Sequence, residues 1–397
     1  VHVTPNLVLN KDGSVLAAFE LTGVDIDDDG GYELERALSE LQESLQALDE
    51  RYYLWVITDK RYKHSTDEFD GTQKNAVVKL IEKRVANRYE SGGVFSIKTH
   101  LFILFTGDTG VYRFMDNVRQ KMTEDGASLG AAILYALNPA NTTRSAALFD
   151  ARQLDVNIDQ AEQGFSAFTH AHSAIQLRRL SANEFNAVLY RSANPTLNLE
   201  DEVDIQTGSI LDASMSATDL RFGREIYAIQ GPNRTQYGYT VSLNGYPSNA
   251  GSLMRLLGVP AEFRIVHAMK CLSLDVSRKA VQENADYYEM SQSTLRQRAA
   301  AYITGRTAEV DPGMHDLYMQ CVEALRRNMA ENLGFVYHSC SISFFDDTSD
   351  GVKRLADSVM RTMGRVPNIR ERLGLKSAVL SGIPGQWAHN QRLMLAN

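Results

Sequence analysis

The chain has 397 residues, of which 44% are hydrophobic and 23% are charged, and its net charge is −8. These proportions are typical of a globular protein that buries a sizeable core over two or three domains or lobes. The acidic balance argues against a general nucleic-acid binder, and no apolar run approaches the roughly 18 residues that a membrane-spanning helix requires.

The first 125 residues alternate between strand and helix patterns. Two strand-like segments, 7–10 and 14–21, flank Asp12 and Gly13, and a glycine here supplies the positive φ that a tight hairpin turn needs. An amphipathic helix is predicted over 32–48, because leucines recur there at helical spacing. The segments that follow are predicted as a strand over 52–58, a helix over 72–89, a strand over 94–105 and a helix over 111–122.

The stretch 126–221 has a looser pattern and is predicted to be a helical insertion with an exposed loop. Helices are expected over 165–179 and 182–190. The polar, turn-rich residues 194–208 are expected to form the loop.

Residues 222–380 repeat the order of the first 125 residues. The expected segments are strands over 226–230 and 237–243, a short helix over 252–257, a strand over 263–274, helices over 276–302 and 311–332, a strand over 335–345 and a helix over 352–363. We therefore predict an α+β fold of two similar sheet-plus-helix lobes, with strand and helix order of the ferredoxin-like type and the helices on one face of the sheet. The predicted domains are 1–125, 126–221 and 222–380, followed by a linker over 381–397.

Two motifs have the residue types of a metal site, and neither is complete. Asp25–Gly30 matches the first half of a calcium-binding loop, but Arg36 stands where the twelfth position needs a bidentate glutamate. A solvated acidic turn before a helix is the better interpretation. His170 and His172 have no carboxylate or cysteine nearby, which favours structural or exposed roles. We predict no metal site in this chain.

The three cysteines, Cys271, Cys321 and Cys340, are an odd number and form no Cys-x-x-Cys motif. This pattern predicts reduced thiols in a cytosolic compartment.

Phosphate-binding and catalytic motifs are missing from the sequence. Gly374-Leu-Lys-Ser377 approaches a phosphate-binding loop but lacks the glycine before the lysine, so its backbone would not cradle phosphates. We therefore predict no cofactor and no ATP turnover for this chain. Two alternatives stay open: a stand-alone enzyme with an unrecognised site, and a nucleic-acid-handling domain that would use the charged helix over 276–302.

Five short stretches follow one another along the chain. They are NLVLNKDGSVLAAFELTGVDI, LWVITDKR, RRLSANEFNAVLYRSANP, VSLNGYPSNAGSLMRLL with AEFRIVHAMKCL, and AVLSGIPGQWAHNQRLMLAN. Together they resemble the N-terminal region of the CagE/TrbE/VirB family of type IV secretion ATPases. The positions that carry the resemblance are Asp12, Gly13, Gly23, Arg61, Gly245, Pro247, Arg264, Pro384, Gly385, Asn390 and Arg392. Gln386 departs from the family pattern, which usually has asparagine there.

The resemblance implies a non-catalytic N-terminal region of an ATPase that energises pilus assembly or substrate transfer in bacteria. ATP and Mg²⁺ would bind in a C-terminal domain beyond Asn397, to which residues 381–397 would lead. The implied location is cytoplasmic, at the inner face of the inner membrane. The implied partners are inner-membrane components of the apparatus, other secretion ATPases and further copies of the parent protein, without direct nucleic-acid contact.

Overall fold

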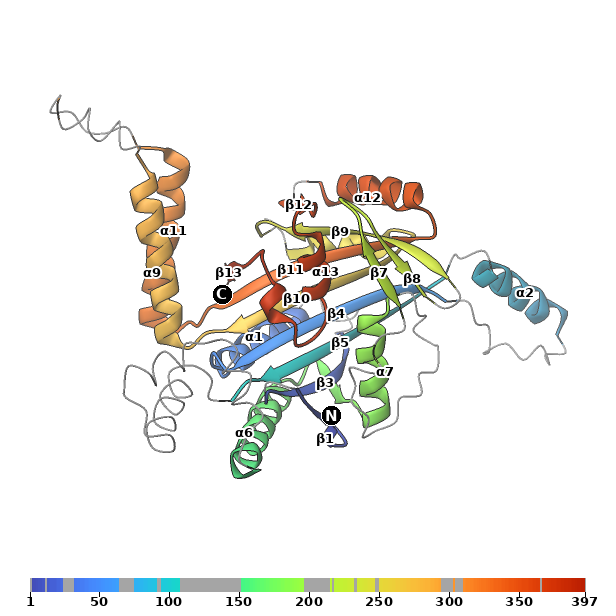
Figure 1. The fold of residues 1–397 in the computed structure, drawn as a ribbon, viewed down its shortest axis with the longest axis horizontal. Coiled ribbons are helices and arrows are strands. Elements are labelled where there is room, and N and C mark those ends of the chain that lie inside the picture. The colour runs from blue at the N-terminus through green and yellow to red at the C-terminus, as the bar shows by residue number, and fades with distance from the viewer. Residues whose placement is uncertain are drawn as a thin grey trace, which may run out of the picture.

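The fold is given by a computed structural model that describes residues 2–10, 13–23, 32–63, 75–90, 94–107, 151–195, 215, 218–231, 234–246, 250–293, 303, 310–364 and 366–396. Within these ranges the protein is mixed α/β, with one large antiparallel sheet of thirteen strands and several helices (Figure 1). The predictions for Asp12, Asp25–Gly30, Pro247 and the helix over 111–122 lie outside the described residues.

The first half of the sheet follows the predicted order of strands and helices. Its elements are β1 (His2–Thr4), β2 (Leu7–Leu9), β3 (Val15–Thr22), α1 (Tyr32–Gln46), β4 (Tyr52–Tyr62), α2 (Ala76–Glu90) and β5 (Phe95–Phe105). The hairpin of β2 and β3 is confirmed: Gly13 has a φ of 82°, and the amide of Asn10 donates to the carbonyl of Ser14 at 2.9 Å.

The middle of the chain contributes to the same sheet. It forms α6 (Ala151–His170), β6 (Gln176–Arg179) and α7 (Ala182–Ala193). The prediction of a helix through Arg179 is wrong, because the helix ends at His170 and Gln176–Arg179 pair with β3. In this strand Leu177 packs on the core, while Arg178 pairs with Glu20 at 2.6 Å.

The second half supplies the remaining elements. They are β7 (Asp219–Phe222), β8 (Tyr227–Gln230), β9 (Thr235–Leu243), the 3-10 helix η2 (Ala250–Gly258), β10 (Glu262–Cys271), α9 (Leu274–Ser291), α11 (Pro312–Glu331), β11 (Val336–Asp346), α12 (Ser349–Met363), β12 (Asn368–Arg370), α13 (Leu375–Ser381), the 3-10 helix η3 (Trp387–His389) and β13 (Met394–Ala396). The predicted hairpin of β8 and β9 is confirmed, and α9 ends before the predicted residue 302.

The two halves join edge to edge in one continuous sheet. The strand order is β1-β2-β3-β5-β4-β10-β11-β9-β8-β7, and β4 pairs with β10 from Lys60 opposite Phe263 to Tyr53 opposite Lys270. Outside this path, β6 pairs with β3, and β12 pairs with β9. Each half therefore has the same order of strands when it is read from its outer edge inwards: β1-β2-β3-β5-β4 in the first half corresponds to β7-β8-β9-β11-β10 in the second.

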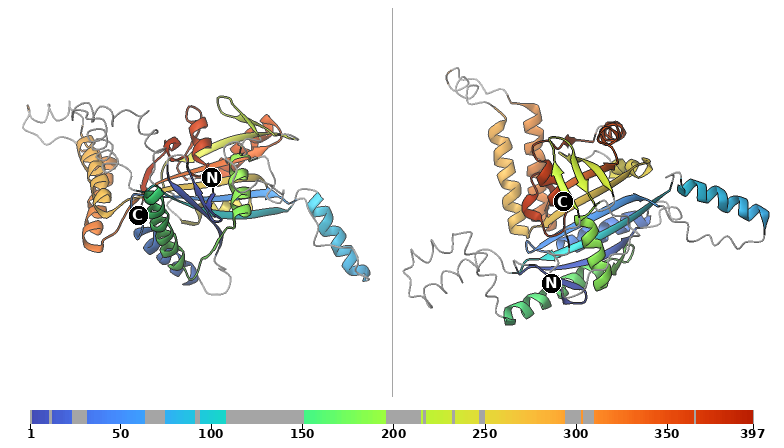
Figure 2. Two further views of the ribbon diagram at one scale, coloured as in Figure 1. Left: turned by 60° about the horizontal axis from the view of Figure 1, so that its bottom comes forward. Right: turned by 45° about the vertical axis from the view of Figure 1, so that its right-hand side comes forward.

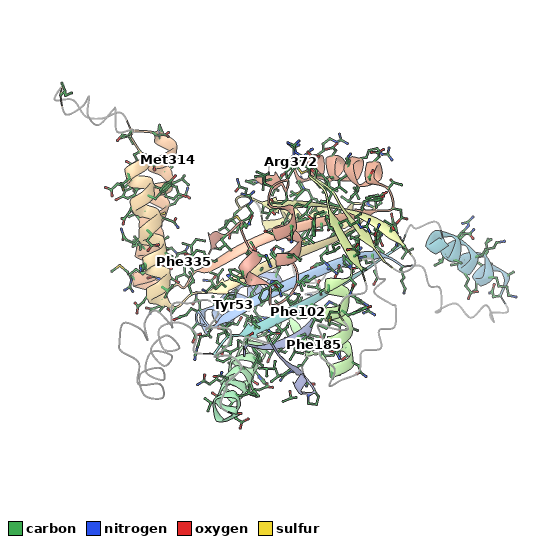
Figure 3. All side chains as sticks on the ribbon, in the orientation of Figure 1. Tyr53, Phe102, Phe185, Met314, Phe335 and Arg372 are labelled. Carbon is green, nitrogen blue, oxygen red and sulfur yellow. The ribbon has the colours of Figure 1, made fainter. Side chains whose placement is uncertain are left out.

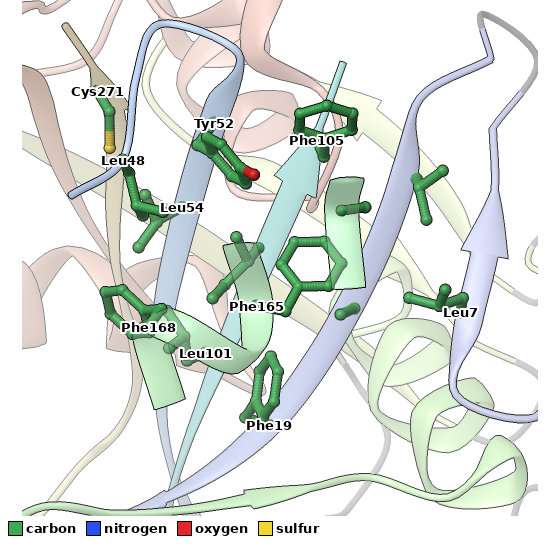
Figure 4. Close-up of a cluster of buried hydrophobic side chains, with 14 residues drawn as sticks. Leu7, Phe19, Leu48, Tyr52, Leu54, Leu101, Phe105, Phe165, Phe168 and Cys271 are labelled. Carbon is green, nitrogen blue, oxygen red and sulfur yellow. The ribbon is translucent and has the colours of Figure 1, made fainter. Parts of the chain in front are cut away.

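Helices cover both faces of the sheet, so the prediction that they lie on one face is wrong. On one face, Phe165 and Phe168 of α6 pack on Phe19 of β3 and Leu54 of β4 (Figure 4). On the other face, Phe185 of α7 packs on a cluster of side chains from the intervening strand positions, among them Leu16, Trp55 and Phe102. Successive side chains of a strand point to opposite faces of the sheet. Central strands that are apolar at every position therefore need helices or other elements packed on both faces.

The leucines of α1 are only partly buried. Leu41 and Leu45 pack against the core, whereas Leu34 and Leu38 are 42% and 54% exposed. The helical spacing of these leucines indicated a helix correctly, but part of its apolar face lies open.

Candidate functional site

A buried group of ionisable side chains lies where the two halves of the sheet meet. Asp59 and Arg61 come from β4, and Glu262 and Arg264 come from β10. All four are less than a tenth exposed, although charged side chains are rarely buried unless they are paired.

Arg264 and Asp59 form the centre of this group. The guanidinium donates from Nε to Oδ1 of Asp59 at 2.8 Å and from Nη2 to Oδ2 at 3.1 Å, which is a bidentate pair. It also donates to the carbonyl oxygens of Ser192 at 2.8 Å and of Arg191 at 3.0 Å. One side chain therefore ties both halves of the sheet to the C-terminal end of α7.

Arg61 lies beside this pair. Its guanidinium stacks over the ring of Phe345 at 4.2 Å, and its Nη2 is 3.6 Å from Oδ1 of Asp59. Burial raises the pKa of Asp59, but the charges of Arg264 and Arg61 outweigh it, so the pKa of this carboxyl lies below its ordinary value. Asp59 is therefore held as a carboxylate between the two guanidinium groups.

The ionic group has little room for a ligand. The adjoining cavity, which Arg264, Tyr227 and Ser343 help to line, holds about 20 Å³, which is the space of a single water molecule. The geometry fits a structural connection between the two halves.

The C-terminal passage makes a second polar group. Arg392 Nε donates to Glu371 Oε1 at 3.1 Å, and Ser339 Oγ donates to Asn390 Oδ1 at 2.8 Å. Gly385 has a φ of 87°, and a β-carbon at this position would lie 3.7 Å from the side-chain nitrogen Nδ2 of Asn10 in the first hairpin. The end of the described chain thus returns to its beginning.

The remaining predicted positions stand apart from these two groups. Gly23 lies at the end of β3 with open space around it, and Gly245 follows β9 beside Pro367. Arg61 and Arg264 meet in one cluster, and Asn390 and Arg392 lie near each other. The structure does not bring all of the predicted positions into a single site.

A stacked chain of three side chains was missed by the sequence reasoning. His267 Nδ1 lies 3.1 Å from His338 Nε2, and the hydroxyl of Tyr246 lies 3.1 Å from His338 Nδ1. Burial lowers the pKa of His267 to about 4 and that of His338 to about 3, which keeps both rings neutral at pH 7. The only signal in the sequence was a histidine in each of two strands, and their register could not be known.

Metal-binding geometry is missing from the part of the chain that the structure describes. No three side chains of histidine, cysteine, aspartate or glutamate gather there in a way that could hold an ion. His170 contacts the carbonyl of Ser166, whereas His172 contacts the hydroxyl of Ser44, so the two imidazoles have different partners. The three cysteines form no disulfide.

Two helical projections expose apolar side chains. Helix α2 makes no substantial packing contact with any other helix or strand of the described residues, and Val77, Leu80 and Ile81 are all more than half exposed. Helices α9 and α11 pack against each other as a hairpin and expose, among others, Met319, Val322 and Met329. None of the helices in the described ranges is long and apolar enough to cross a membrane.

A protein-family model matches part of the chain. The family model described as type IV secretion system ATPase VirB4/TrbE, N-terminal domain, matches residues 6–111, which include β2, β3, β4 and β5 with α1 and α2. A search of curated proteins finds no match. Residues 6–111 of this chain are therefore similar to the N-terminal domain of the type IV secretion system ATPases of the VirB4/TrbE family.

Proposed function

We propose that this chain is the non-catalytic docking and assembly region of an ATPase that energises a bacterial type IV secretion or conjugation system. The observation that carries the proposal is the family match over residues 6–111, the half of the sheet from which the unpacked helix α2 projects. Contiguous apolar side chains left in water on a projecting element are typical of protein contact surfaces.

The architecture supports a scaffold built from a repeated unit. In the first half the strands lie in the order β6-β3-β5-β4, and in the second half they lie in the order β12-β9-β11-β10. We attribute these matching orders to two ferredoxin-like lobes that share one sheet. The buried pair of Asp59 and Arg264 then fixes one lobe against the other.

The proposed partners are inner-membrane components of the secretion apparatus, at the cytoplasmic face of the inner membrane. ATP and Mg²⁺ would be bound by another domain of the parent ATPase. The proposed role of this chain is to position that domain on the apparatus.

Binding to purified inner-membrane components of the same secretion apparatus tests this function. We expect the full chain to bind at least one of them, and we expect it to release no phosphate from ATP above a protein-free control. Leu373→Glu, at a fully exposed leucine outside both helical projections, serves as a surface control and should bind as the unaltered chain does. ATP turnover that follows the protein through purification, or a failure to bind any of the components, would contradict the proposal.

A further inference from the structure

The two helical projections occupy equivalent places in the two halves of the sheet. Helix α2 lies in the connection between β4 and β5, and the α9–α11 hairpin lies in the connection between β10 and β11. Because the halves meet edge to edge in opposite orientations, α2 projects beyond one end of the sheet and the hairpin beyond the other (Figures 1 and 2). Each copy therefore has one projection at each end.

The exposed surface of α2 is amphipathic and basic. Val77, Leu80 and Ile81 have the three- and four-residue spacing that places side chains on one face of a helix. Over residues 76–87 of α2, three side chains are basic, Lys79, Lys83 and Arg84, and one is acidic, Glu82. A lone helix of 15 residues with an uncovered apolar face gains stability from a partner.

The base of the α9–α11 hairpin offers a groove with the complementary character. A cavity of about 570 Å³ runs along α11. Its apolar lining is Met319, Ala324 and Phe335, and its polar lining is Asp316, Glu323, Gln320 and Arg327, so carboxylates outnumber the one cation there. Figure 3 shows Phe335 at the base of the hairpin and Met314 near its far end.

A second cavity adjoins this groove. It holds about 340 Å³, and Phe335 also lines it, together with Leu38 and Leu41 of α1 and Leu272 after β10. The open apolar side of α1 thus continues the surface that begins on α11.

We propose that α2 of one copy of this chain docks into the α11 groove of a second copy, an inference that rests on the proposed assembly role and names its contact surface. The net charges are opposite: α2 is basic, whereas in α9 and α11 the carboxylates of Asp275, Glu283, Asp286, Glu289, Asp316, Glu323 and Glu331 outnumber Arg278, Lys279, Arg326 and Arg327. The lengths are also compatible. The 15 residues of α2 span about 22 Å, so this helix can lie along α11, whose 20 residues span about 30 Å.

The occupant of the groove is a second copy, because the molecule's own α2 lies at the opposite end of the sheet (Figure 1). Such a contact is head-to-tail, as it joins two different surfaces of the same protein. Each docked copy leaves one α2 and one groove open, so the contact repeats and produces a ring or an open chain of copies. An amphipathic helix in an apolar groove is a common recognition mode between proteins.

Sedimentation velocity of the full chain at increasing concentration, up to about 100 µM, tests the contact. We expect self-association, and we expect Leu80→Glu and Met319→Glu each to weaken it at least about tenfold. Both side chains are about half exposed, so circular dichroism and thermal melting should show that the variants stay folded. The control Leu373→Glu should associate as the unaltered chain does.

Mixing the two variants gives the decisive result. The Leu80→Glu chain keeps its groove and the Met319→Glu chain keeps its α2, so an equimolar mixture should form heterodimers and stop there. A chain that stays monomeric, variants that associate normally, or a mixture that stays monomeric would each overturn the proposal.

A membrane partner for α2 is tested in parallel by flotation with phosphatidylglycerol vesicles. If Leu80→Glu abolishes vesicle binding and leaves self-association unchanged, α2 is a membrane-binding helix and the proposal is wrong. Failure of self-association while the apparatus components still bind would leave the proposed function intact. Loss of component binding with intact self-association would contradict the function alone.

Discussion

At the scale of single residues, a group of buried charged side chains lies where β4 of the first half pairs with β10 of the second. The residues that form the Asp59–Arg264 pair are 205 positions apart in the chain, and both are buried. A buried ion pair contributes little net free energy, but removal of one partner leaves the other charge uncompensated.

Arg264→Ala should lower the free energy of unfolding by about 3–5 kcal/mol, because the Asp59 carboxylate would stay buried without its counter-charge. Chemical denaturation monitored by circular dichroism measures this change. The matched control is Arg221→Ala, which breaks the exposed pair of Arg221 and Asp219 and should change the free energy by less than about 1 kcal/mol. Equal effects of the two variants would contradict the structural role of the buried pair.

The neutral histidines predict a pH dependence of stability. In the unfolded chain, His267 and His338 take up protons below about pH 6.5, whereas the folded protein resists this until the pKa values of about 4 and about 3. The unfolded state thus binds more protons in this window, so acidification from pH 6.5 towards 4 should destabilise the protein. Each ring should contribute on the order of 1–2 kcal/mol at pH 5.

Thermal melting between pH 7 and pH 5 checks this expectation. Between pH 7 and pH 5, the Tm of His267→Asn should fall by less than the Tm of the unaltered chain, because asparagine does not titrate. An unchanged fall would show that these buried rings do not control the acid response.

At the scale of elements, α12 shows how local sequence and packing act together. Thr348 caps the helix by accepting a hydrogen bond from the amide of Gly351 at 3.0 Å. Val352, Ala356, Val359 and Met363 then follow at helical spacing and are all buried. The helix has both a signal for its start and an apolar face for the core.

Thr348→Ala should destabilise the protein by about 1 kcal/mol, because a donor of the first turn loses its acceptor. The comparison is Thr362→Ala near the end of the same helix, where alanine removes no cap and should be neutral or slightly stabilising. Urea denaturation of both variants measures the difference, and a neutral Thr348→Ala would show that the cap does not contribute.

At the scale of the whole molecule, the C-terminal residues lie against the first half of the sheet. Trp55 of β4 donates its indole N–H to the carbonyl of Ser381 at 3.1 Å, and Trp387 packs edge-on against Trp55 at 6.3 Å. The C-terminal passage therefore packs on a strand of the first half. Gly385 also lies near the first half, because it is close to Asn10 of the first hairpin.

Features that depend on nearby residues could be predicted from the sequence. The hairpin of β2 and β3 followed from Asp12 and Gly13 between two strand-like segments, and α12 followed from its helical spacing. Both rest on contacts within a few positions along the chain. The segment 176–179 was predicted wrongly because it pairs with β3, whose residues lie some 150 positions earlier.

The sequence by itself determined the class of fold, most strands and helices, and the family resemblance, because these depend on local periodicity and short motifs. Only the tertiary structure decided that both halves share one sheet, that helices cover both of its faces, and that Arg61 and Arg264 meet at Asp59. Strand partners, register and the burial of charge depend on residues far apart in the chain, so side-chain spacing along one segment does not determine them. The same holds for α2 and the α11 groove, whose positions at opposite ends of the molecule follow from the pairing of β4 with β10.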